Sequence, residues 1–316
     1  MSRCLVTGGA GFVGSHLSDE LLKRGHRVTV LDNLITGKLE NIAQNKRHPR
    51  FRFVKADVSK PLPKSLGQHD RVFHLASPAS PVGYMRHSME TILTNSLGTY
   101  RLLEYCARHK ARFLFASTSE VYGDPAVHPQ KESYWGNVNS FGPRSCYDES
   151  KRLGEALVYE ALRKWRVDAR LIRIFNTYGP RLNENDGRVV SNFIVQGLKG
   201  EKLTVYGDGG QTRSFCFVSD LVDGIIRAME KPGTRGQVFN LGNPQETPIG
   251  RFALVVLKYL GLPLSHRVHR PIPQDDPVRR RPDITRAGKV LGWKPRVSLE
   301  EGLGRTIEWY RGRICP

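Results

Sequence analysis

The chain has 316 residues, 39% of them hydrophobic and 25% charged, which is typical of a soluble protein with a sizeable core. No apolar run approaches the roughly 18 residues of a membrane span, and the glycine-interrupted start, followed by Asp19 and Glu20, does not resemble a signal peptide. The net charge is +19, but the 49 basic residues are spread along the chain, without a basic block interleaved with aromatics. We expect an anionic substrate, with no nucleic-acid and no membrane partner.

The five cysteines are odd in number and scattered, and none has C-x-x-C spacing. This pattern disfavours a disulfide framework and a zinc site. We therefore expect no bound metal and a reducing, cytoplasmic location.

The first predicted elements form a dinucleotide-binding unit. An apolar strand at residues 4–6 leads into a glycine-rich turn at residues 8–14, then a helical pattern, then a second strand at residues 28–31 that ends at Asp32. Glycines let the backbone approach a pyrophosphate at a helix N-terminus, and the acid accepts ribose hydroxyls. Asp32 also repels a 2′-phosphate, so NAD is favoured over NADP. A merely structural turn would not require the strand, the helix and the acid together.

The alternation of strands and helices continues along the chain. Apolar strands are predicted at residues 51–54, 71–76, 113–116 and 171–175, and helices at residues 86–109 and 146–166. This rhythm predicts an α/β fold with a doubly wound parallel sheet of the Rossmann type.

After residue 175 the chain becomes polar and rich in proline. We expect residues 1–179 with 213–240 to form the NAD-binding domain, and residues 180–212 with 241–316 to form a smaller C-terminal substrate domain. The proline- and arginine-rich segment 271–282 is either an ordered binding loop or a solvated linker.

A reaction centre is predicted at the start of the helix at 146–166. Tyr147 and Lys151 are four residues apart, so they share one helix face. A neighbouring ammonium stabilises phenolate, so we expect the pKa of Tyr147 to fall from about 10 toward neutrality.

Three motifs resemble the extended short-chain dehydrogenases that modify nucleotide sugars: TGGAGFVG at residues 7–14, Tyr147-x-x-x-Lys151 and NTYGP at residues 176–180. Further segments resemble the UDP-glucuronate decarboxylase family of that superfamily: HLASPASP (74–81), STSEVYGDP (117–125), YWGNVN (134–139), DGRVVSNF (186–193), QTRSF (211–215) and RRPDI (280–284). The resemblance covers essentially the whole chain.

The resemblance implies UDP-glucuronate as substrate and NAD as cofactor. Tyr147 would take the proton of the sugar 4-hydroxyl, Lys151 would assist it and hold the nicotinamide ribose, and Thr118 would hydrogen-bond the same hydroxyl. The 4-ketone formed at that carbon lies β to the carboxylate, which allows loss of carbon dioxide, protonation at C5 and return of hydride to give UDP-xylose. Two alternatives are a 4-epimerase or dehydratase acting on a related nucleotide sugar, and a non-catalytic NAD-binding protein.

Ser119 and Glu120 favour the decarboxylase. The related dehydratases carry Asp-Glu here, and UDP-galactose 4-epimerases usually lack the glutamate. The resemblance implies that Glu120 and Arg280 flank the sugar carboxylate, either to orient it, to expel it or to manage the C5 proton. Otherwise Glu120 is a surface carboxylate and Arg280 belongs to a solvated arginine run.

The resemblance also assigns binding roles by position. The expected cofactor contacts are Gly8, Gly11, Phe12, Val13, Asp32, Asn33, Thr36, Gly37, Asp57, Val58, Leu75, Ala76, Ser77, Thr94, Ala116, Tyr147, Lys151, Thr177 and Arg188. The expected substrate contacts are Ser80, Tyr84, Ser119, Glu120, Asn176, Tyr206, Gln211, Arg213 and Arg280.

Three expectations concern packing and assembly. Tyr206 lies either against uracil or in the core, and His74 and Trp135 are expected to be structural. The helices at 86–109 and 146–166 match those that form a homodimer interface in the family.

Overall fold

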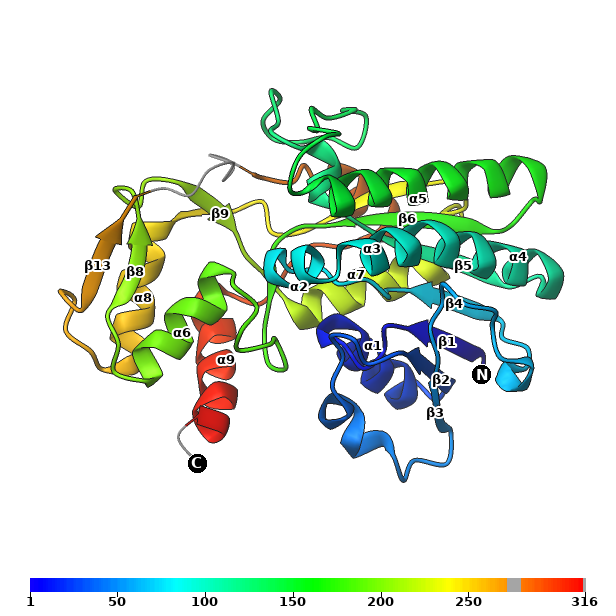
Figure 1. Ribbon diagram of the computed structural model, residues 1–316, viewed down its shortest axis with the longest axis horizontal. Helices are drawn as coiled ribbons and strands as arrows, with labels where there is room; N and C mark the ends of the chain where they lie inside the picture. Colours follow the sequence, from blue (N-terminus) through cyan, green and yellow to red (C-terminus); the bar gives the residue numbers. More distant parts are fainter. Residues whose placement is uncertain (272–279, 315–316) are drawn as a thin grey trace.

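A seven-stranded parallel sheet is the centre of the molecule (Figure 1). The computed structural model describes residues 1–271 and 280–314. The sheet order is β11-β6-β5-β4-β1-β2-β3, and the strands are β1 (Arg3–Thr7), β2 (Arg27–Asp32), β3 (Phe51–Lys55), β4 (Arg71–His74), β5 (Arg112–Thr118), β6 (Ala169–Ile174) and β11 (Val238–Leu241). This sheet, with helices on its faces, confirms the predicted Rossmann-type fold.

Both faces of the sheet are apolar, which explains why its strands read as continuous apolar runs. In β5, Leu114 and Ala116 pack into one core cluster, whereas Phe113 and Phe115 pack into the other. Successive side chains of a strand point to opposite faces. Helices α1 (Phe12–Lys23) and α7 (Val218–Glu230) pack together on the first face, and α4 (Thr99–His109) and α5 (Ser145–Lys164) pack together on the second.

The helix predicted at residues 86–109 is confirmed from Ser88 onward as one continuous helical run. It consists of α3 (Ser88–Leu93), a π-helical turn (Thr94–Gly98) and α4, and a short separate helix, α2 (Pro81–Arg86), precedes it. The break falls at His87, whose backbone is not helical (φ −121°, ψ 52°). Ser80 caps α2 by accepting a hydrogen bond from the Gly83 amide. The helix predicted at residues 146–166 is α5, which ends before Arg166, a residue with positive φ.

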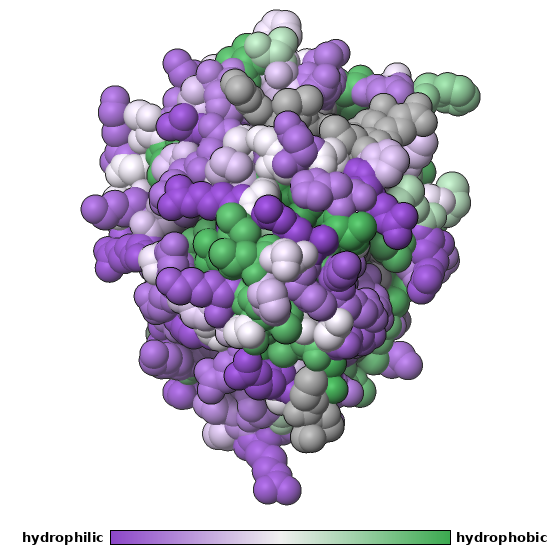
Figure 2. Space-filling model, turned by 90° about the vertical axis from the view of Figure 1, so that its left-hand side faces the viewer, coloured by the Kyte–Doolittle hydropathy of each residue, from purple (hydrophilic) through white to green (hydrophobic). Residues whose placement is uncertain are grey.

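The remaining elements lie beside the carboxyl ends of the sheet strands, on the left of Figure 1. The strands pair as β8 (Leu203–Tyr206) with β13 (Arg267–Arg270), β9 (Thr212–Ser214) with β12 (Glu246–Pro248), and β7 (Thr177–Tyr178) with β10 (Cys216–Phe217). The helices here are α6 (Val189–Leu198), α8 (Ile249–Leu260) and α9 (Leu299–Ile314). Their outward face is mostly hydrophilic, with apolar side chains gathered near its middle (Figure 2).

The last part of the chain runs back to the large sheet before entering α9. A π-helical segment, Ala287–Leu291, packs on α7 and β11, and the Trp293 indole donates to the Asp220 carbonyl over 2.8 Å. Among the described residues, no helix combines the length and apolar character needed to cross a bilayer.

Candidate active site

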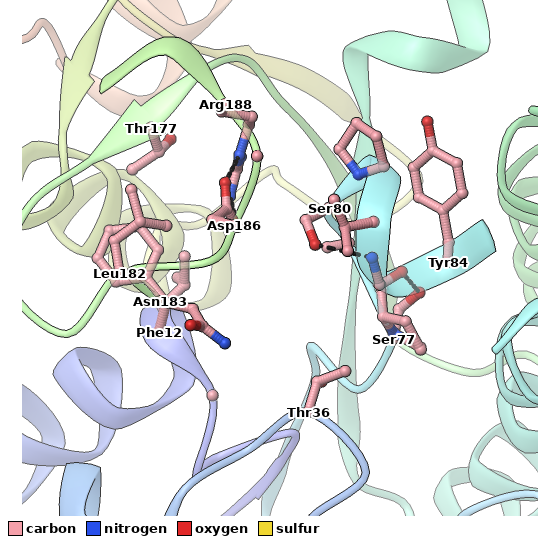
Figure 3. Close-up of a pocket in the computed structure, with 18 of the residues that line it drawn as sticks. Phe12, Thr36, Ser77, Ser80, Tyr84, Thr177, Leu182, Asn183, Asp186 and Arg188 are labelled. Atoms are coloured by element: carbon pink, nitrogen blue, oxygen red, sulfur yellow. Dashed lines mark hydrogen bonds and ion pairs between the residues drawn. The ribbon is translucent and has the colours of Figure 1, made fainter. Parts of the chain in front are cut away.

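A cavity of about 1120 Å³ lies between the carboxyl ends of the sheet strands and the α6–β8 part of the chain. Figure 3 shows its two walls: Asp186, Arg188 and Thr177 on one, Ser80 and Tyr84 on the other. All the predicted site residues line this cavity except Asp57. Its size, and its position at the carboxyl ends of the strands near the topological switch point of the α/β sheet, suit a dinucleotide together with a second ligand.

The glycine turn after β1 is built by close backbone approach. Gly8 has φ +71°, and a Cβ on it would lie 2.7 Å from the Ala76 backbone. A Cβ on Gly14 would lie 2.2 Å from the Gly8 carbonyl oxygen. Helix α1 starts directly after Gly11, so its free amides and positive dipole end face the cavity beside this turn.

Asp32 sits at the end of β2 on the cavity wall. Its carboxylate accepts hydrogen bonds from the Ala10 amide (3.0 Å) and the Leu34 amide (2.8 Å). Burial raises its pKa, and these two hydrogen bonds oppose that shift. A Cβ on Gly37 would lie 2.9 Å from the carboxylate, so glycine leaves room beside the acid.

Asp57 lies behind the cavity wall. It accepts a hydrogen bond from the Asn33 side-chain amide (3.2 Å) and others from the Ser59 amide (2.8 Å) and hydroxyl (2.7 Å). Asn33 itself lines the cavity. In this structure Asp57 therefore orients Asn33.

The Tyr147–Lys151 pair is buried beside the end of β5. The Lys151 ammonium donates to the Ala116 carbonyl (2.8 Å) and lies 5.8 Å from the centre of the Tyr147 ring. Burial raises the pKa of Tyr147, although a hydrogen bond with Thr118 opposes it, and burial lowers the pKa of Lys151 to about 7. The expectation that Lys151 brings the pKa of Tyr147 from about 10 toward neutrality is wrong for the protein without cofactor, because burial desolvates both groups.

Tyr84 covers the ring of Tyr147. The two rings are stacked, with centres 4.9 Å apart and planes 7° apart. The Tyr84 hydroxyl is buried and has no hydrogen-bond partner among the described residues. Tyr84 is thus placed to restrict the orientation of the Tyr147 phenol.

Glu120 is held between two arginines just after β5. One carboxylate oxygen accepts from the Arg280 guanidinium and the other from the Arg144 guanidinium. Burial opposes ionisation, but the two positive charges hold the pKa of Glu120 below its usual value. Arg280 is 5% exposed and also donates to the Gly123 carbonyl (3.2 Å), so neither residue belongs to a solvated surface.

Sequence reasoning missed Arg144 and Asp148. Arg144 Nε lies 3.8 Å from Asp148 Oδ2, and Asp148 is 6% exposed. Burial and then the Glu120 charge raise the pKa of Asp148 to about 7. The i,i+4 spacing of an arginine and an aspartate at the start of a predicted helix is the signal that would have found the pair.

The opposite wall carries Arg188, which was predicted to contact the cofactor, and the predicted substrate residues Tyr206, Gln211 and Arg213. Arg188 is paired with Asp186 (Figure 3). Tyr206 ends β8 and is 38% exposed on the cavity, so it is not a core residue. The Gln211 side chain donates to the Tyr206 carbonyl (3.0 Å), and Arg213 donates to the Thr212 carbonyl (2.9 Å).

The two residues expected to be structural have different outcomes. His74 is buried, and its ring nitrogens contact the hydroxyls of Thr7 (2.8 Å) and Thr99 (3.2 Å), which confirms a structural role. Trp135 is 89% exposed, so the expectation that it is structural is wrong for its side chain. Its backbone carbonyl accepts a hydrogen bond from Arg152 (2.8 Å). Segment 271–282 remains open, because its residues 272–279 lie outside the described part of the chain.

The fold and site define a protein of the short-chain dehydrogenase type. The features that do so are the glycine turn, the acid at the end of the second strand and the Tyr-x-x-x-Lys pair, all on a parallel α/β sheet. The chain belongs to the NAD dependent epimerase/dehydratase family, whose model matches residues 4–242. UDP-glucuronic acid decarboxylase 1 of Danio rerio is 52% identical over 98% of this chain and 72% of its own length.

Solved structures with the same fold carry nucleotide sugars. UDP-glucose 4-epimerase of Thermotoga maritima, solved with UDP-glucose, is 33% identical with a TM-score of 0.89, covering 99% of both chains. UDP-glucuronic acid 4-epimerase of Bacillus cereus, solved with UDP-glucuronic acid and NAD, is 29% identical with a TM-score of 0.89, covering 98% of this chain and 99% of that one.

Proposed function

We propose that this protein is an NAD-dependent UDP-glucuronate decarboxylase that forms UDP-xylose through a 4-keto intermediate. The observation that carries the proposal is the geometry after β5. There Glu120, clamped by Arg280 and Arg144, lies on the same cavity as Tyr147, and Ser119 stands where a dehydratase has an acid. The 52% identity to a UDP-glucuronic acid decarboxylase supports it.

NAD is the proposed cofactor. The glycine turn and the α1 N-terminus suit its pyrophosphate, and Asp32 with the space beside Gly37 suits a ribose that carries free hydroxyls. Bound there, NAD would supply reversible hydride transfer at C4 of the sugar and the positive charge of its oxidised ring. This positive charge would lower the pKa of Tyr147, which Lys151 does not achieve without the cofactor.

Tyr147 is the proposed base for the sugar 4-hydroxyl. Thr118 hydrogen-bonds the tyrosine and so favours its deprotonated form. Lys151 is fixed by the Ala116 carbonyl and titrates near neutrality, so it becomes fully charged when a negative group approaches it. Stacking on Tyr84 limits the phenol to one plane, which positions its oxygen for the transfer.

The carboxylate end of the sugar is assigned to Arg280, Arg144 and Glu120. The guanidiniums attract the sugar carboxylate, and Arg280 Nε has no hydrogen-bond partner within the described residues. Glu120 is ionised at neutral pH, so it acts as a negative neighbour of that carboxylate and not as the acid that protonates C5. Loss of carbon dioxide moves an electron pair into the 4-ketone and relieves this repulsion.

A second copy of the chain is the proposed partner. The outer surface of α3, the π-helical turn, α4 and α5 exposes large apolar side chains, namely Met89, Leu93, Leu97, Tyr100, Leu153, Tyr159 and Trp165. Such a surface suits burial in a homodimer. Cys4, Cys106, Cys146 and Cys216 are free, which supports the proposed reducing, cytoplasmic location.

The test is product analysis. The purified protein, incubated with UDP-glucuronate and NAD, is expected to release carbon dioxide and UDP-xylose in equal amounts. Appearance of UDP-galacturonate without carbon dioxide would make the protein a 4-epimerase, the activity of its Bacillus cereus structural relative.

A further inference from the structure

Asp148 occupies an unusual position behind the proposed carboxylate site. It follows Tyr147 on α5, is 6% exposed and does not line the cavity. Its Oδ2 lies 3.8 Å from Arg144 Nε, while its Oδ1 has no hydrogen-bond partner among the described residues. A buried carboxylate oxygen without a donor is costly when ionised and tolerable when protonated.

The charges around Asp148 come from every element packed on it. They are Arg144 and Glu149 at the start of α5, Glu120 after β5, Arg280, and the phenols of Tyr84 and Tyr147. Helix α3 also packs on α5, and its Glu90 is exposed to solvent. Among these groups, the guanidiniums of Arg144 and Arg280 both pair with the ionised Glu120, which leaves one positive charge in excess. An ionised Asp148 cancels that excess, and so does a sugar carboxylate bound at the same guanidiniums.

We propose that Asp148 is a positioning residue that takes up a proton when the sugar carboxylate binds, so that the Arg144 guanidinium is released to the substrate. This inference rests on the proposed function. The Asp148 carboxylate and the sugar carboxylate compete for the same excess positive charge. Arg144 carries that charge to both, because it contacts Asp148 and also pairs with Glu120 at the proposed sugar site. The pKa of Asp148 in the unliganded protein is about 7, raised chiefly by burial, so the exchange falls in the range where enzymes of this kind are assayed.

The matched ligand pair UDP-glucuronate and UDP-xylose isolates this effect, because the two differ by the carboxyl group alone. Neither diphosphate diester nor hexuronate carboxyl titrates between pH 6 and 8.5. Lys151 does titrate there, but the nicotinamide ribose that it is expected to hold is present in both complexes, so its effect cancels in the ratio. The dissociation constants are measured with NAD present in a Tyr147→Phe background, which prevents turnover.

The ratio of the dissociation constant of UDP-glucuronate to that of UDP-xylose is expected to rise with pH, by up to about tenfold per pH unit above pH 7. With Asp148→Asn added, the ratio is expected to stay constant. Calorimetry in two buffers of different ionisation enthalpy provides a second measurement that needs no substitution at Asp148. UDP-glucuronate is expected to bind with more proton uptake at pH 7.5 than UDP-xylose.

The inference would be overturned if the ratio of dissociation constants did not change with pH and the two ligands bound with equal proton uptake. It would also be overturned if the ratio rose with pH as steeply in the Asp148→Asn protein as without that substitution. The proposed function is judged separately, by carbon dioxide release from the wild-type enzyme. If the wild-type enzyme makes UDP-xylose but the Tyr147→Phe protein gives a ratio that does not change with pH, only the role of Asp148 is contradicted.

Discussion

At the scale of single residues, the site depends on how burial changes the charge of each group. Tyr147 is desolvated, and its pKa rises, although an ammonium lies on the same helix face. Glu120 is also desolvated, but two guanidiniums bonded to its oxygens keep it ionised. The difference is contact: a direct ion pair outweighs desolvation, whereas a cation beyond hydrogen-bond range does not.

Removing the Tyr147 hydroxyl is expected to abolish turnover and leave NAD binding intact. Tyr147→Phe lacks the proposed base, so the rate should fall by roughly 10²–10⁴-fold. Tyr159→Phe, on the exposed side of the same helix, is the matched control and should retain activity. Turnover measured at neutral pH checks this, and a Tyr147→Phe protein as active as the control removes the tyrosine from the base role.

The folded pKa of Asp148 gives a stability prediction. It is raised from 3.8 to about 7, so the residue's stabilising contribution is fully present below pH 4 and is lost as the pH rises toward 7. Asparagine stays neutral in both states. The melting temperature of Asp148→Asn relative to wild type should therefore increase from pH 5 to pH 8. A difference that does not change with pH would show that Asp148 does not titrate as described.

At the scale of elements, the β1–turn–α1 unit is held by glycines that nothing larger can replace. Gly14→Ala would place a Cβ 2.2 Å from the Gly8 carbonyl oxygen, within the turn that faces the cavity. We expect loss of NAD binding and a lower melting temperature. Binding is measured by titration of NAD.

Two other glycines provide controls for that substitution. Gly200 has φ +73° but nothing within 4 Å of its Cβ position, so Gly200→Ala tests backbone strain without a clash. Gly312 lies in α9 with open space around it, so alanine should be neutral or slightly stabilising. If Gly14→Ala binds NAD as well as these variants do, the close approach is not required.

The elements also show what sequence patterns can predict. The strands were predictable because both sheet faces are covered, so residues such as Phe113 and Leu114 form an unbroken apolar run. The break at His87 was not, because apolar spacing continues through it. Arg144 was missed because an arginine before a helix is common, and its contact with Glu120 depends on the loop between them. Periodicity likewise carries no information on the exposure of Trp135.

At the scale of the whole molecule, the proposed cofactor and substrate residues line one shared cavity. The sheet edge supplies the glycine turn, Asp32 and the Tyr147–Lys151 pair. The segments around α6, β8 and β9 supply Arg188, Tyr206 and Arg213. A parallel sheet was predictable from residues 1–179, although its edge strand β11 (Val238–Leu241) lies outside them. Glu120 and Arg280 are 160 residues apart, and their meeting was predictable only from the family resemblance, because no local pattern links positions so distant in the chain.

The apolar surface on α3–α5 gives a prediction about assembly. The protein is expected to run at twice its chain mass in light scattering, and Met89→Glu with Leu153→Glu should shift it toward the monomer. The control is Leu264→Glu. Leu264 is an exposed apolar residue between α8 and β13, away from the α3–α5 surface, so this substitution should leave the mass unchanged. A wild-type protein that is monomeric at assay concentration contradicts the homodimer.

The central claim is that one site oxidises C4, releases carbon dioxide and returns the same hydride. UDP-glucuronate deuterated at C4 tests this in a single reaction, read by mass spectrometry and proton NMR. We expect carbon dioxide together with UDP-xylose that keeps the deuterium at C4 and gains one solvent hydrogen at C5. A product that still carries the carboxylate, or UDP-xylose that has lost the C4 deuterium, would contradict it.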